Sequence, residues 1–342
     1  MDIFDFEQGP IRPPSEADSL LIRTTEGCPW NKCSFCTLFK GMDFTIRPVE
    51  DIKRDIWAAK QHYGNRQFDA CFLQDGDSFA MDSADLIEVL TTLKQAFPSL
   101  TKISSYGRAQ TMSKKSAAEL KAICEAGLNN LYCGMESGSV EVLRMVKKGI
   151  TPNSILKSSL HAKAAGMQMM IFVILGLGGQ RHSAEHIRAT AALLNQIDPE
   201  EIRVLSLAVK PGTELDQQLQ RGQFTPLSEQ QMLAEQRQLL QLLDSAKGRY
   251  GNYHGINLLT ELNGTLAQDR QQMISRIDRL LALPLAQQRN FILGRRLGYY
   301  RRLEDLDNSL LHDSVAAQLA RLGECNEDQF QLLCHDLRRR LI

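Results

Sequence analysis

Three cysteines lie close together near the start of the chain, at Cys28, Cys33 and Cys36, with the spacing C-x4-C-x2-C. Three thiolates on one short loop can bind a single metal centre. A structural zinc ion usually takes four protein ligands from two knuckles, and a [4Fe–4S] cluster is normally held by four thiolates. The next cysteine, Cys71, lies far downstream in an expected strand. The set of three therefore indicates a cluster with one iron open to another ligand, with a zinc knuckle or three unrelated thiols as the alternatives.

Short apolar runs alternate with helical patterns over the first 210 residues. The run from Met169 to Leu175 is apolar throughout, as expected of parallel strands that are buried on both faces. Such alternation predicts parallel βαβ units, and six units are too few for an eight-fold barrel. The expected strands are 20–25, 69–73, 101–106, 129–135, 167–175 and 201–209, and the expected helices are 47–63, 83–97, 113–126, 139–148, 153–165 and 182–197.

Residues that can bind a ligand follow the second and third of these strands, at the end where such α/β folds hold their ligands. In Asp75-Gly76-Asp77 the glycine permits close backbone approach, and a carboxylate can accept a hydrogen bond from an ammonium group. A solvated Asp-Gly turn is the alternative. Arg108 can pair with a carboxylate through two parallel hydrogen bonds, or it is an ordinary surface arginine.

The fourth and fifth strands also end in candidate residues. Glu136 emerges from a buried strand, where a carboxylate must be compensated by partners. Gly176 lies in a glycine-rich turn, which is a weak signal by itself. Cys71, Cys124 and Cys133 fit small buried hydrophobic positions better than ligand positions.

The cysteine loop, with the aromatic Phe35 just before its last cysteine, resembles the cluster loop of the radical SAM superfamily. The resemblance implies that Cys28, Cys33 and Cys36 hold a [4Fe–4S] cluster whose fourth iron is chelated by S-adenosylmethionine. The usual family spacing is C-x3-C-x2-C, so this loop carries one additional residue. The resemblance further implies that the cofactor is bound by Phe35, Asp75, Gly76, Asp77, Arg108, Glu136 and Gly176.

Two later segments resemble those of one subset of this superfamily. The run from Gly134 to Gly138, followed by Lys147-Lys148-Gly149, is similar to that of the oxygen-independent coproporphyrinogen oxidase, methylthiotransferase and Elongator-type members. A Pro-Gly-Thr turn at 211–213 recurs in the same subset. The resemblance covers roughly residues 20–215 and implies an α/β fold, a partial (β/α)6 barrel with a mainly helical C-terminal extension.

Length and composition limit the class of protein and the partners that can be expected. The chain has 342 residues, with 40 basic and 40 acidic side chains, so its global charge predicts no polyanionic partner. Eight unevenly spaced cysteines without a signal peptide predict a cytoplasmic protein, and no apolar run is long enough to cross a membrane. We expect a lead-in over 1–19, a core over 20–223 and a helical region over 224–342. The expected helices of that region are 228–247, 267–282, 286–302, 312–322 and 326–340.

The C-terminal region offers two further candidates. His254 and Asn257, in an expected extended segment over 253–259, face a substrate at the barrel mouth or are structural. Five arginines within 286–302 form either an RNA-facing strip or a solvated helix face. They are Arg289, Arg295, Arg296, Arg301 and Arg302.

The function implied by the resemblance is reductive cleavage of S-adenosylmethionine to a 5′-deoxyadenosyl radical that abstracts hydrogen from a substrate. The partners are then a reductant such as flavodoxin or ferredoxin and an unidentified small molecule or peptide, with RNA as a weaker expectation. The altered Asp75-Gly76-Asp77 motif leaves a non-catalytic iron–sulfur module or sensor as the alternative. A radical SAM enzyme that modifies RNA is a second alternative.

Overall fold

The computed structural model describes residues 12–323 and 325–341. The chain forms two compact units, which are described separately. The first unit contains the chain up to Met135 together with Lys147–Ile171, and the second contains Glu136–Val146 together with the chain from Phe172 onward. The expected domain limits, 20–223 and 224–342, stay a prediction.

The first unit is built on a parallel sheet. Its strands lie in the order β1-β4-β5-β6-β7, and the registers of the first three pairs are all parallel. These strands are β1 (Leu20–Arg23), β4 (Ala70–Gln74), β5 (Lys102–Tyr106), β6 (Leu128–Glu136) and β7 (Gln168–Leu175), of which β7 continues into the second unit. Side chains on both faces are buried, as Leu21, Ile22, Phe72 and Leu73 show. This confirms the expectation that was drawn from the continuous apolar runs.

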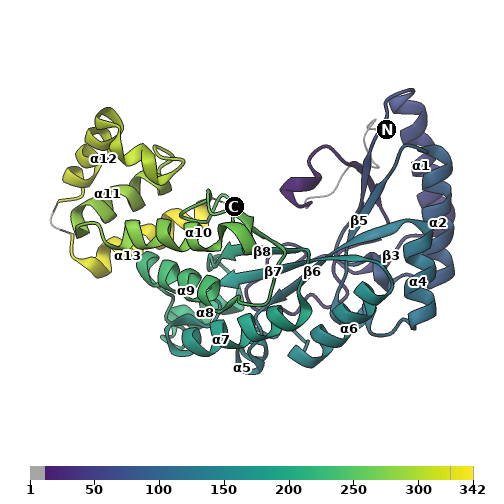
Figure 1. The fold of residues 1–342 in the computed structure, drawn as a ribbon, viewed down its shortest axis with the longest axis horizontal. Coiled ribbons are helices and arrows are strands. Elements are labelled where there is room, and N and C mark those ends of the chain that lie inside the picture. The colour runs from purple at the N-terminus through teal and green to yellow at the C-terminus, as the bar shows by residue number, and fades with distance from the viewer. Residues whose placement is uncertain (1–11, 324, 342) are drawn as a thin grey trace. The chain divides into compact units, whose positions relative to one another are not determined.

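Helices of the first unit pack along the sheet and against one another (Figure 1). They are α1 (Val49–Tyr63), α2 (Ser83–Ala96), α3 (Ala109–Met112), α4 (Ala117–Ala126) and α6 (Pro152–Ala164). Their starts follow local chemistry, because Ser116 and Thr151 each cap a helix through reciprocal hydrogen bonds with the third helical residue. The expected helix 113–126 is therefore wrong at its start, since the Ser116 cap places the first helical residue at Ala117.

The lead-in reaches the sheet through one buried acid. Glu16, in a short 3-10 turn over Pro14–Glu16, is fully buried. Its carboxylate accepts hydrogen bonds from the hydroxyls of Ser104 at 3.0 Å and Tyr132 at 2.7 Å, and Lys102 Nζ lies 2.6 Å away. The expected irregular lead-in is thus anchored over its described part, while its residues 1–11 lie outside the described residues.

In the second unit the strands lie in the order β7-β8-β9-β10. Strand β8 (Glu201–Ser206) pairs in parallel with β9 (Arg249–Gly251), which pairs antiparallel with β10 (Gly264–Thr265). The expected extended segment over 253–259 is wrong, because that segment is turns and bends between β9 and β10. A three-residue strand is too short to show a period in the sequence.

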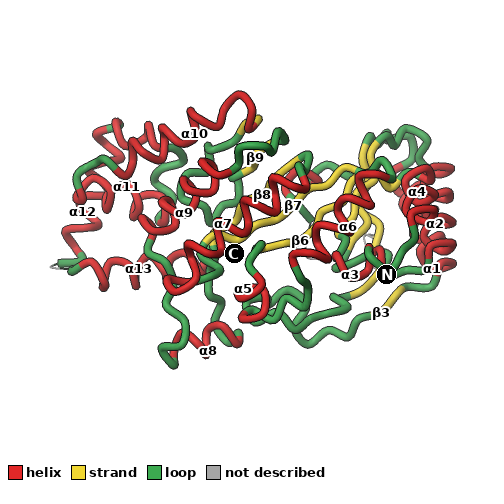
Figure 2. The backbone as a smooth tube through the Cα atoms, turned by 60° about the horizontal axis from the view of Figure 1, so that its bottom comes forward, coloured by secondary structure: helices red, strands yellow, loops and turns green. Residues whose placement is uncertain are grey.

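Helices dominate the rest of the second unit (Figure 2). The helices of this unit are α5 (Val140–Met145), α7 (Gly179–Ile197), α8 (Glu214–Gln220), α9 (Glu229–Leu242), α10 (Leu266–Leu281), α11 (Leu285–Arg296), α12 (Ser309–Arg321) and α13 (Glu327–Arg340). The expected helix 286–302 ends early at Arg296. Gly298 follows in the left-handed region with φ 82°, and the N–H of Tyr299 turns back to the Gly294 carbonyl.

A buried ion network joins three of these helices. Arg296 of α11 donates two hydrogen bonds to Glu229 of α9, at 2.9 and 2.6 Å, and Arg338 of α13 lies 3.8 Å from the same carboxylate. All three side chains are almost fully buried. Burial acts to raise the pKa of Glu229, but the two guanidinium groups hold that pKa below its usual value.

Two more of the five clustered arginines are bonded within the protein. Arg289 pairs with Glu327 at 2.7 Å, and Arg295 donates to the Leu258 carbonyl at 2.8 Å and to the Tyr300 carbonyl at 2.6 Å. Together with Arg296, this engages three of the five in folding contacts. The structure therefore weakens the hypothesis of an RNA-facing strip.

Taken by units, the described chain is an α/β fold with a mainly parallel sheet, helices around it and a helical C-terminal part. This confirms the expected fold class. No helix in the described residues has the length and apolar character that a membrane crossing requires.

Candidate functional site

The cysteine loop is closed at its base by a small hairpin in the first unit. Strand β2 (Thr25–Glu26) pairs antiparallel with β3 (Thr45–Ile46), so the loop between them begins and ends at neighbouring points. Gly27 opens the loop with φ 75°, a conformation that favours glycine. The two strands lie in a sheet of their own, and the expected single strand 20–25 is divided between it and β1.

The three thiols of this loop lie within nine residues of the chain. Cys33 is buried, while Cys28 and Cys36 are partly buried. Burial raises the pKa of Cys36, and charge on Cys33 and Cys28 would raise it further. Thiolates are the donors that iron–sulfur clusters use. The donor chemistry of the loop therefore fits a cluster. Among the described residues, however, no three Cys, His, Asp or Glu side chains are already arranged as a metal site.

Three of the other five cysteines have the surroundings of packing residues. Cys71, Cys133 and Cys334 are fully buried. Burial raises the pKa of Cys71 and of Cys334 far above the usual thiol value, which keeps both protonated and unreactive. This agrees with the expectation that Cys71 and Cys133 are small buried hydrophobic side chains. Cys124, for which the same was expected, is only partly buried, because it lies on a helix at a position that faces solvent in part.

Asp75 and Gly76 hold the root of the cysteine loop. Asp75 Oδ2 accepts a hydrogen bond from the Gly27 N–H at 3.0 Å, and the Gly76 N–H donates to the Gly27 carbonyl at 3.0 Å. A Cβ at position 76 would lie 2.5 Å from the Gly27 oxygen and 3.0 Å from the Cys28 Cα. Only glycine therefore fits at position 76 without moving the loop. The predicted contact of these two residues with the cofactor stays a prediction.

Asp77, the next residue along the chain, is fully buried. Its carboxylate accepts from Thr111 Oγ1 at 2.6 Å and from the Arg108 N–H at 3.4 Å. Burial raises the pKa of Asp77 to about 7, against the opposing effects of the Thr111 hydrogen bond and the Arg108 charge. The sequence analysis did not single out Thr111, because a lone threonine in a helix carries no local signal.

Arg108 reaches the cysteine loop from the end of β5. Its Nη1 lies 4.0 Å from Cys28 Sγ, and its Nη2 donates to the Lys148 carbonyl at 3.3 Å. The guanidinium also lies 5.9 Å from the centre of the Trp30 ring. The structure thus brings Arg108, Asp77, Gly76 and Asp75 around the predicted cysteine ligands, and it adds Trp30 and Lys148, for which no role was predicted. Phe35 is partly buried.

Glu136 belongs to the second unit and has an unusual backbone. It ends β6 with φ 64°, in the left-handed region that non-glycine residues rarely adopt, and only 9% of it is exposed. Strain of this kind clusters at functional sites. The Gly138 N–H donates to Thr190 Oγ1 at 2.9 Å, and any Cβ on Gly138 would overlap the α7 backbone. Helix α7 therefore fixes the turn that presents Glu136.

His186 supports the same turn from α7. Its Nε2 faces the Ile174 carbonyl at 3.1 Å and therefore carries the proton, so Nδ1 accepts from Ser137 Oγ at 2.8 Å. Burial lowers the pKa of His186 to about 4. The imidazole is neutral at physiological pH and acts as a fixed hydrogen-bonding bridge.

Gly176 also lies in the second unit, where Glu235 of α9 accepts its N–H. Glu235 is buried and also accepts from Ser183 Oγ at 2.7 Å. Burial raises the pKa of Glu235 to about 7, although both hydrogen bonds act to lower it. The sequence did not indicate Glu235, because it lies 59 residues from its partner.

Asn257 has a structural role. Its amide nitrogen donates to the Val204 carbonyl at 2.7 Å and to the Asn252 carbonyl at 3.1 Å. The hypothesis that Asn257 meets a substrate is therefore less favoured than its structural alternative. His254 is partly buried, and its Nδ1 accepts the Ile256 N–H at 3.4 Å.

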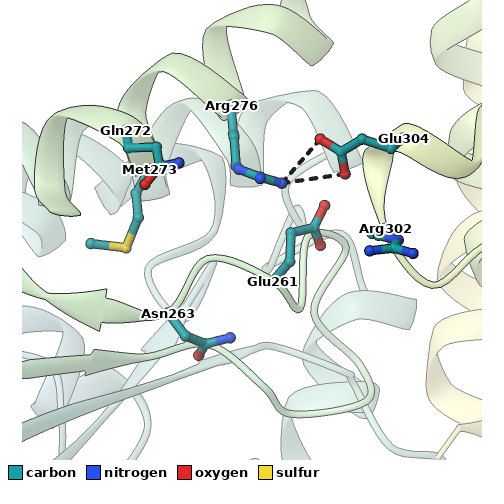
Figure 3. Close-up of a pocket in the computed structure, with 7 residues that line it drawn as sticks. All are labelled: Glu261, Asn263, Gln272, Met273, Arg276, Arg302 and Glu304. Carbon is teal, nitrogen blue, oxygen red and sulfur yellow. Dashed lines mark hydrogen bonds and ion pairs between the residues drawn. The ribbon is translucent and has the colours of Figure 1, made fainter.

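The second unit also contains a cavity of about 440 Å³ between α10 and the turns near Arg302 (Figure 3). Arg276 donates to both carboxylate oxygens of Glu304, at 3.1 and 3.3 Å, so opposite charges in the wall satisfy one another. Of the residues singled out in the sequence, Arg302 of the arginine cluster lines this cavity, and none of the predicted cofactor or metal ligands does. Its lining residues are Glu261, Asn263, Gln272, Met273, Arg276, Arg302 and Glu304.

The fold and the cysteine loop define an α/β protein with a candidate iron–sulfur site at the ends of parallel strands. The family model of the radical SAM superfamily matches residues 22–194, half of the chain, and the chain belongs to this superfamily. Membership confirms the family expected from the sequence. Membership also supports the prediction that the chain is an enzyme. The reaction class of this enzyme stays open, and its subfamily stays unassigned. A [4Fe–4S] cluster, S-adenosylmethionine and a reductant are what this family generally requires.

Among known proteins, the chain is 27% identical over 197 residues to an uncharacterized methyltransferase of Pyrococcus horikoshii. The matched region covers 57% of this chain and 40% of that protein. Solved structures with a similar fold include methylornithine synthase, with a TM-score of 0.50 and 17% identity over 85% of this chain and 84% of that one. Another is the cobalamin-dependent radical enzyme OxsB, with a TM-score of 0.51 and 13% identity over 94% and 57%. These likenesses support the partial barrel. The chain spans about half the length of the curated relatives it matches.

Proposed function

We infer that this chain is a radical SAM enzyme in which Cys28, Cys33 and Cys36 bind a [4Fe–4S] cluster. The observation that carries the proposal is the cysteine loop itself. Three cysteines lie on a loop that is closed by a hairpin and held at its root by Asp75 and Gly76. With three protein thiolates, one iron remains for S-adenosylmethionine. When bound, the cluster and the cofactor supply one-electron reductive cleavage to a 5′-deoxyadenosyl radical, which abstracts hydrogen from a substrate.

The residues of the chain position and shield this chemistry. Arg108 brings a guanidinium to the cysteine loop, where it can pair with the carboxylate of the cofactor. Asp77 holds the Arg108 backbone and Thr111 in place. In the second unit, Glu136 and Gly176 are the proposed cofactor contacts, fixed by α7 and by Glu235 respectively. Phe35, beside the last cysteine, is proposed to pack near the cofactor.

The test is anaerobic reconstitution with iron and sulfide, followed by addition of S-adenosylmethionine and dithionite. We expect iron near four atoms per chain and release of 5′-deoxyadenosine. The Cys33→Ala variant is the matched control and should give neither. Protein that holds a full cluster but releases no 5′-deoxyadenosine would refute the proposed reaction.

A second candidate is a non-catalytic iron–sulfur module or sensor. The observation that favours it is the engagement of Asp75 with the Gly27 N–H, which occupies an acid that the resemblance assigns to the cofactor. A titration of the reduced cluster with S-adenosylmethionine discriminates the two. A changed EPR spectrum supports the enzyme, and an unchanged spectrum supports the sensor.

The remaining assignments belong to the same proposal. The electron donor is a small reductant such as flavodoxin or ferredoxin, and the compartment is the reducing cytoplasm, in which eight thiols persist. The substrate is a small molecule or peptide. RNA is the weaker alternative because three of the five clustered arginines form hydrogen bonds within the protein. Binding of the protein to bulk tRNA at low salt would favour the RNA hypothesis again.

A further inference from the structure

The cavity in the second unit is lined by charged side chains from three segments of the chain (Figure 3). Glu261 comes from the turns between β9 and β10, Arg276 from α10, and Arg302 and Glu304 from the segment that follows α11. At about 440 Å³ the cavity has the size of a site for a small molecule. It is formed within the second unit, because all of its lining residues belong to that unit.

Two of these four charged side chains bind each other. Arg276 donates to both carboxylate oxygens of Glu304, at 3.1 and 3.3 Å. Arg279, on the next turn of α10, lies 3.5 Å from the same carboxylate. Glu304 and Arg276 are therefore compensated within the wall, and the charges that remain for a ligand belong to Glu261 and Arg302.

Glu261 has one carboxylate oxygen that no donor satisfies. Its Oε1 accepts the Leu303 N–H at 2.8 Å, which fixes the orientation of the carboxylate. Among the described residues its Oε2 has no hydrogen-bond partner, although the atom is buried. Burial raises the pKa of Glu261, against the effects of backbone hydrogen bonds and of charge on Arg295 and Arg276. A buried carboxylate oxygen without a donor is costly, so the wall of the cavity lacks a cationic donor at this point.

Arg302 supplies the opposite charge to the same cavity. Its side chain is 69% exposed, and Nε lies 3.5 Å from Asp305 Oδ1, which is the one ion pair of this guanidinium among the described residues. Guanidinium groups bind carboxylates through two parallel N–H bonds. Met273, which is buried, adds an apolar side chain to the lining. The cavity therefore combines a carboxylate, a guanidinium and an apolar surface.

We propose that this cavity binds a small zwitterion, such as a free α-amino acid, whose ammonium donates to Glu261 Oε2 and whose carboxylate pairs with Arg302. A ligand with only a positive charge would leave Arg302 without its partner. A ligand with only a negative charge would lie against the carboxylates of Glu261 and Glu304. None of the predicted cofactor or metal ligands lines the cavity, so this inference does not rest on the proposed function.

The test is thermal unfolding of the full chain in the presence of each common L-amino acid, because a ligand that binds the folded state raises its melting temperature. The amino acid that stabilises the chain most is then titrated by calorimetry, together with its amide and its deaminated acid. The amide lacks the carboxylate, and the deaminated acid lacks the ammonium. Each should bind at least about tenfold more weakly than the amino acid, because each loses a charge-assisted contact.

Two variants test the residues that are assigned to the ligand. Glu261→Gln and Arg302→Gln should each weaken binding of that amino acid by about tenfold or more. Arg301→Gln is the matched control, because it removes the same charge from an exposed neighbour that does not line the cavity, and it should bind like the wild type. Arg302→Gln keeps the test decisive if Glu261→Gln folds poorly, because surface substitutions change stability little.

Three results would overturn the inference. They are a wild-type chain that no amino acid stabilises, an amide or deaminated acid that binds as tightly as its amino acid, and an Arg302→Gln variant that binds like Arg301→Gln. Each of these results would leave the proposed function standing, because none of them measures the cluster.

Discussion

Replacing Gly76 by alanine should loosen the cysteine loop. The new Cβ would lie 2.5 Å from the Gly27 oxygen and 3.0 Å from the Cys28 Cα, and both of these atoms belong to the backbone. No rotamer change can relieve such a clash, so the strand end and the loop must separate. Separation breaks the hydrogen bond from the Gly76 N–H to the Gly27 carbonyl, and it strains the one from the Gly27 N–H to Asp75.

The magnitude follows from these contacts. Inserting a methyl group into a tightly packed site costs about 1–3 kcal/mol, and each hydrogen bond contributes about 1 kcal/mol. We expect the free energy of unfolding to fall by about 2–3 kcal/mol, on the same grounds. Iron loading should fall as well, because the Cys28 backbone is displaced.

The assay is denaturant unfolding of the metal-free protein together with iron content after reconstitution. Gly107→Ala is the matched control. Gly107 follows the neighbouring strand. A Cβ there would meet side-chain atoms at ordinary distances, Met112 Sδ at 3.4 Å and Met112 Cγ and Phe79 Cδ2 at 3.6 Å. If Gly76→Ala unfolds and loads iron like Gly107→Ala and the wild type, the account of the loop root is wrong.

Two further predictions concern the second unit. The pKa of His186 is lowered to about 4 from an unfolded value near 6.5. Between these pH values the imidazole is protonated in the unfolded chain but not in the folded chain. The stability that is present above pH 6.5 is therefore lost as the pH falls towards 4. The loss amounts to about 3 kcal/mol, and denaturant unfolding as a function of pH should show a flatter profile for His186→Gln; identical profiles would contradict the burial argument. Glu229→Gln leaves two buried guanidinium groups without their carboxylate and should cost about 3–5 kcal/mol in unfolding free energy, whereas Glu304→Gln, at a partly exposed pair with Arg276, should cost under about 1 kcal/mol. Equal losses in the two variants would show that the buried network contributes no more than a surface pair.

Local patterns in the sequence were sufficient for most of the fold. Apolar runs predicted the parallel strands, and helical spacing predicted most helices within a few residues. The errors have physical causes. Ser116 caps a helix three residues after its expected start, and Gly298 marks the end of a helix that was expected to continue. Strand β9 has too few residues to display a period.

The sequence predicted which residue types belong to the candidate site, but it did not predict the contacts that these residues make. The sequence singled out Asp75 and Gly76 as candidate site residues, yet their hydrogen bonds to Gly27 join positions 48 and 49 residues apart, which no local pattern reveals. The same limit applies to Trp30, whose partner Lys147 lies 117 residues away. Arg296 was grouped with four neighbouring arginines as an RNA-facing strip or a solvated helix face, whereas the fold buries it against Glu229.

The central claim is that three cysteines, and no others, bind the cluster and leave one iron open. The most direct test measures iron content in eight reconstituted single variants, each with one cysteine replaced by alanine. We expect Cys28→Ala, Cys33→Ala and Cys36→Ala to lose the cluster, because two remaining thiolates cannot hold it. The other five variants, at Cys71, Cys124, Cys133, Cys325 and Cys334, should keep wild-type iron. A need for any of these five would mean that a fourth protein thiolate closes the site, and it would contradict both the open iron and the radical chemistry that depends on it.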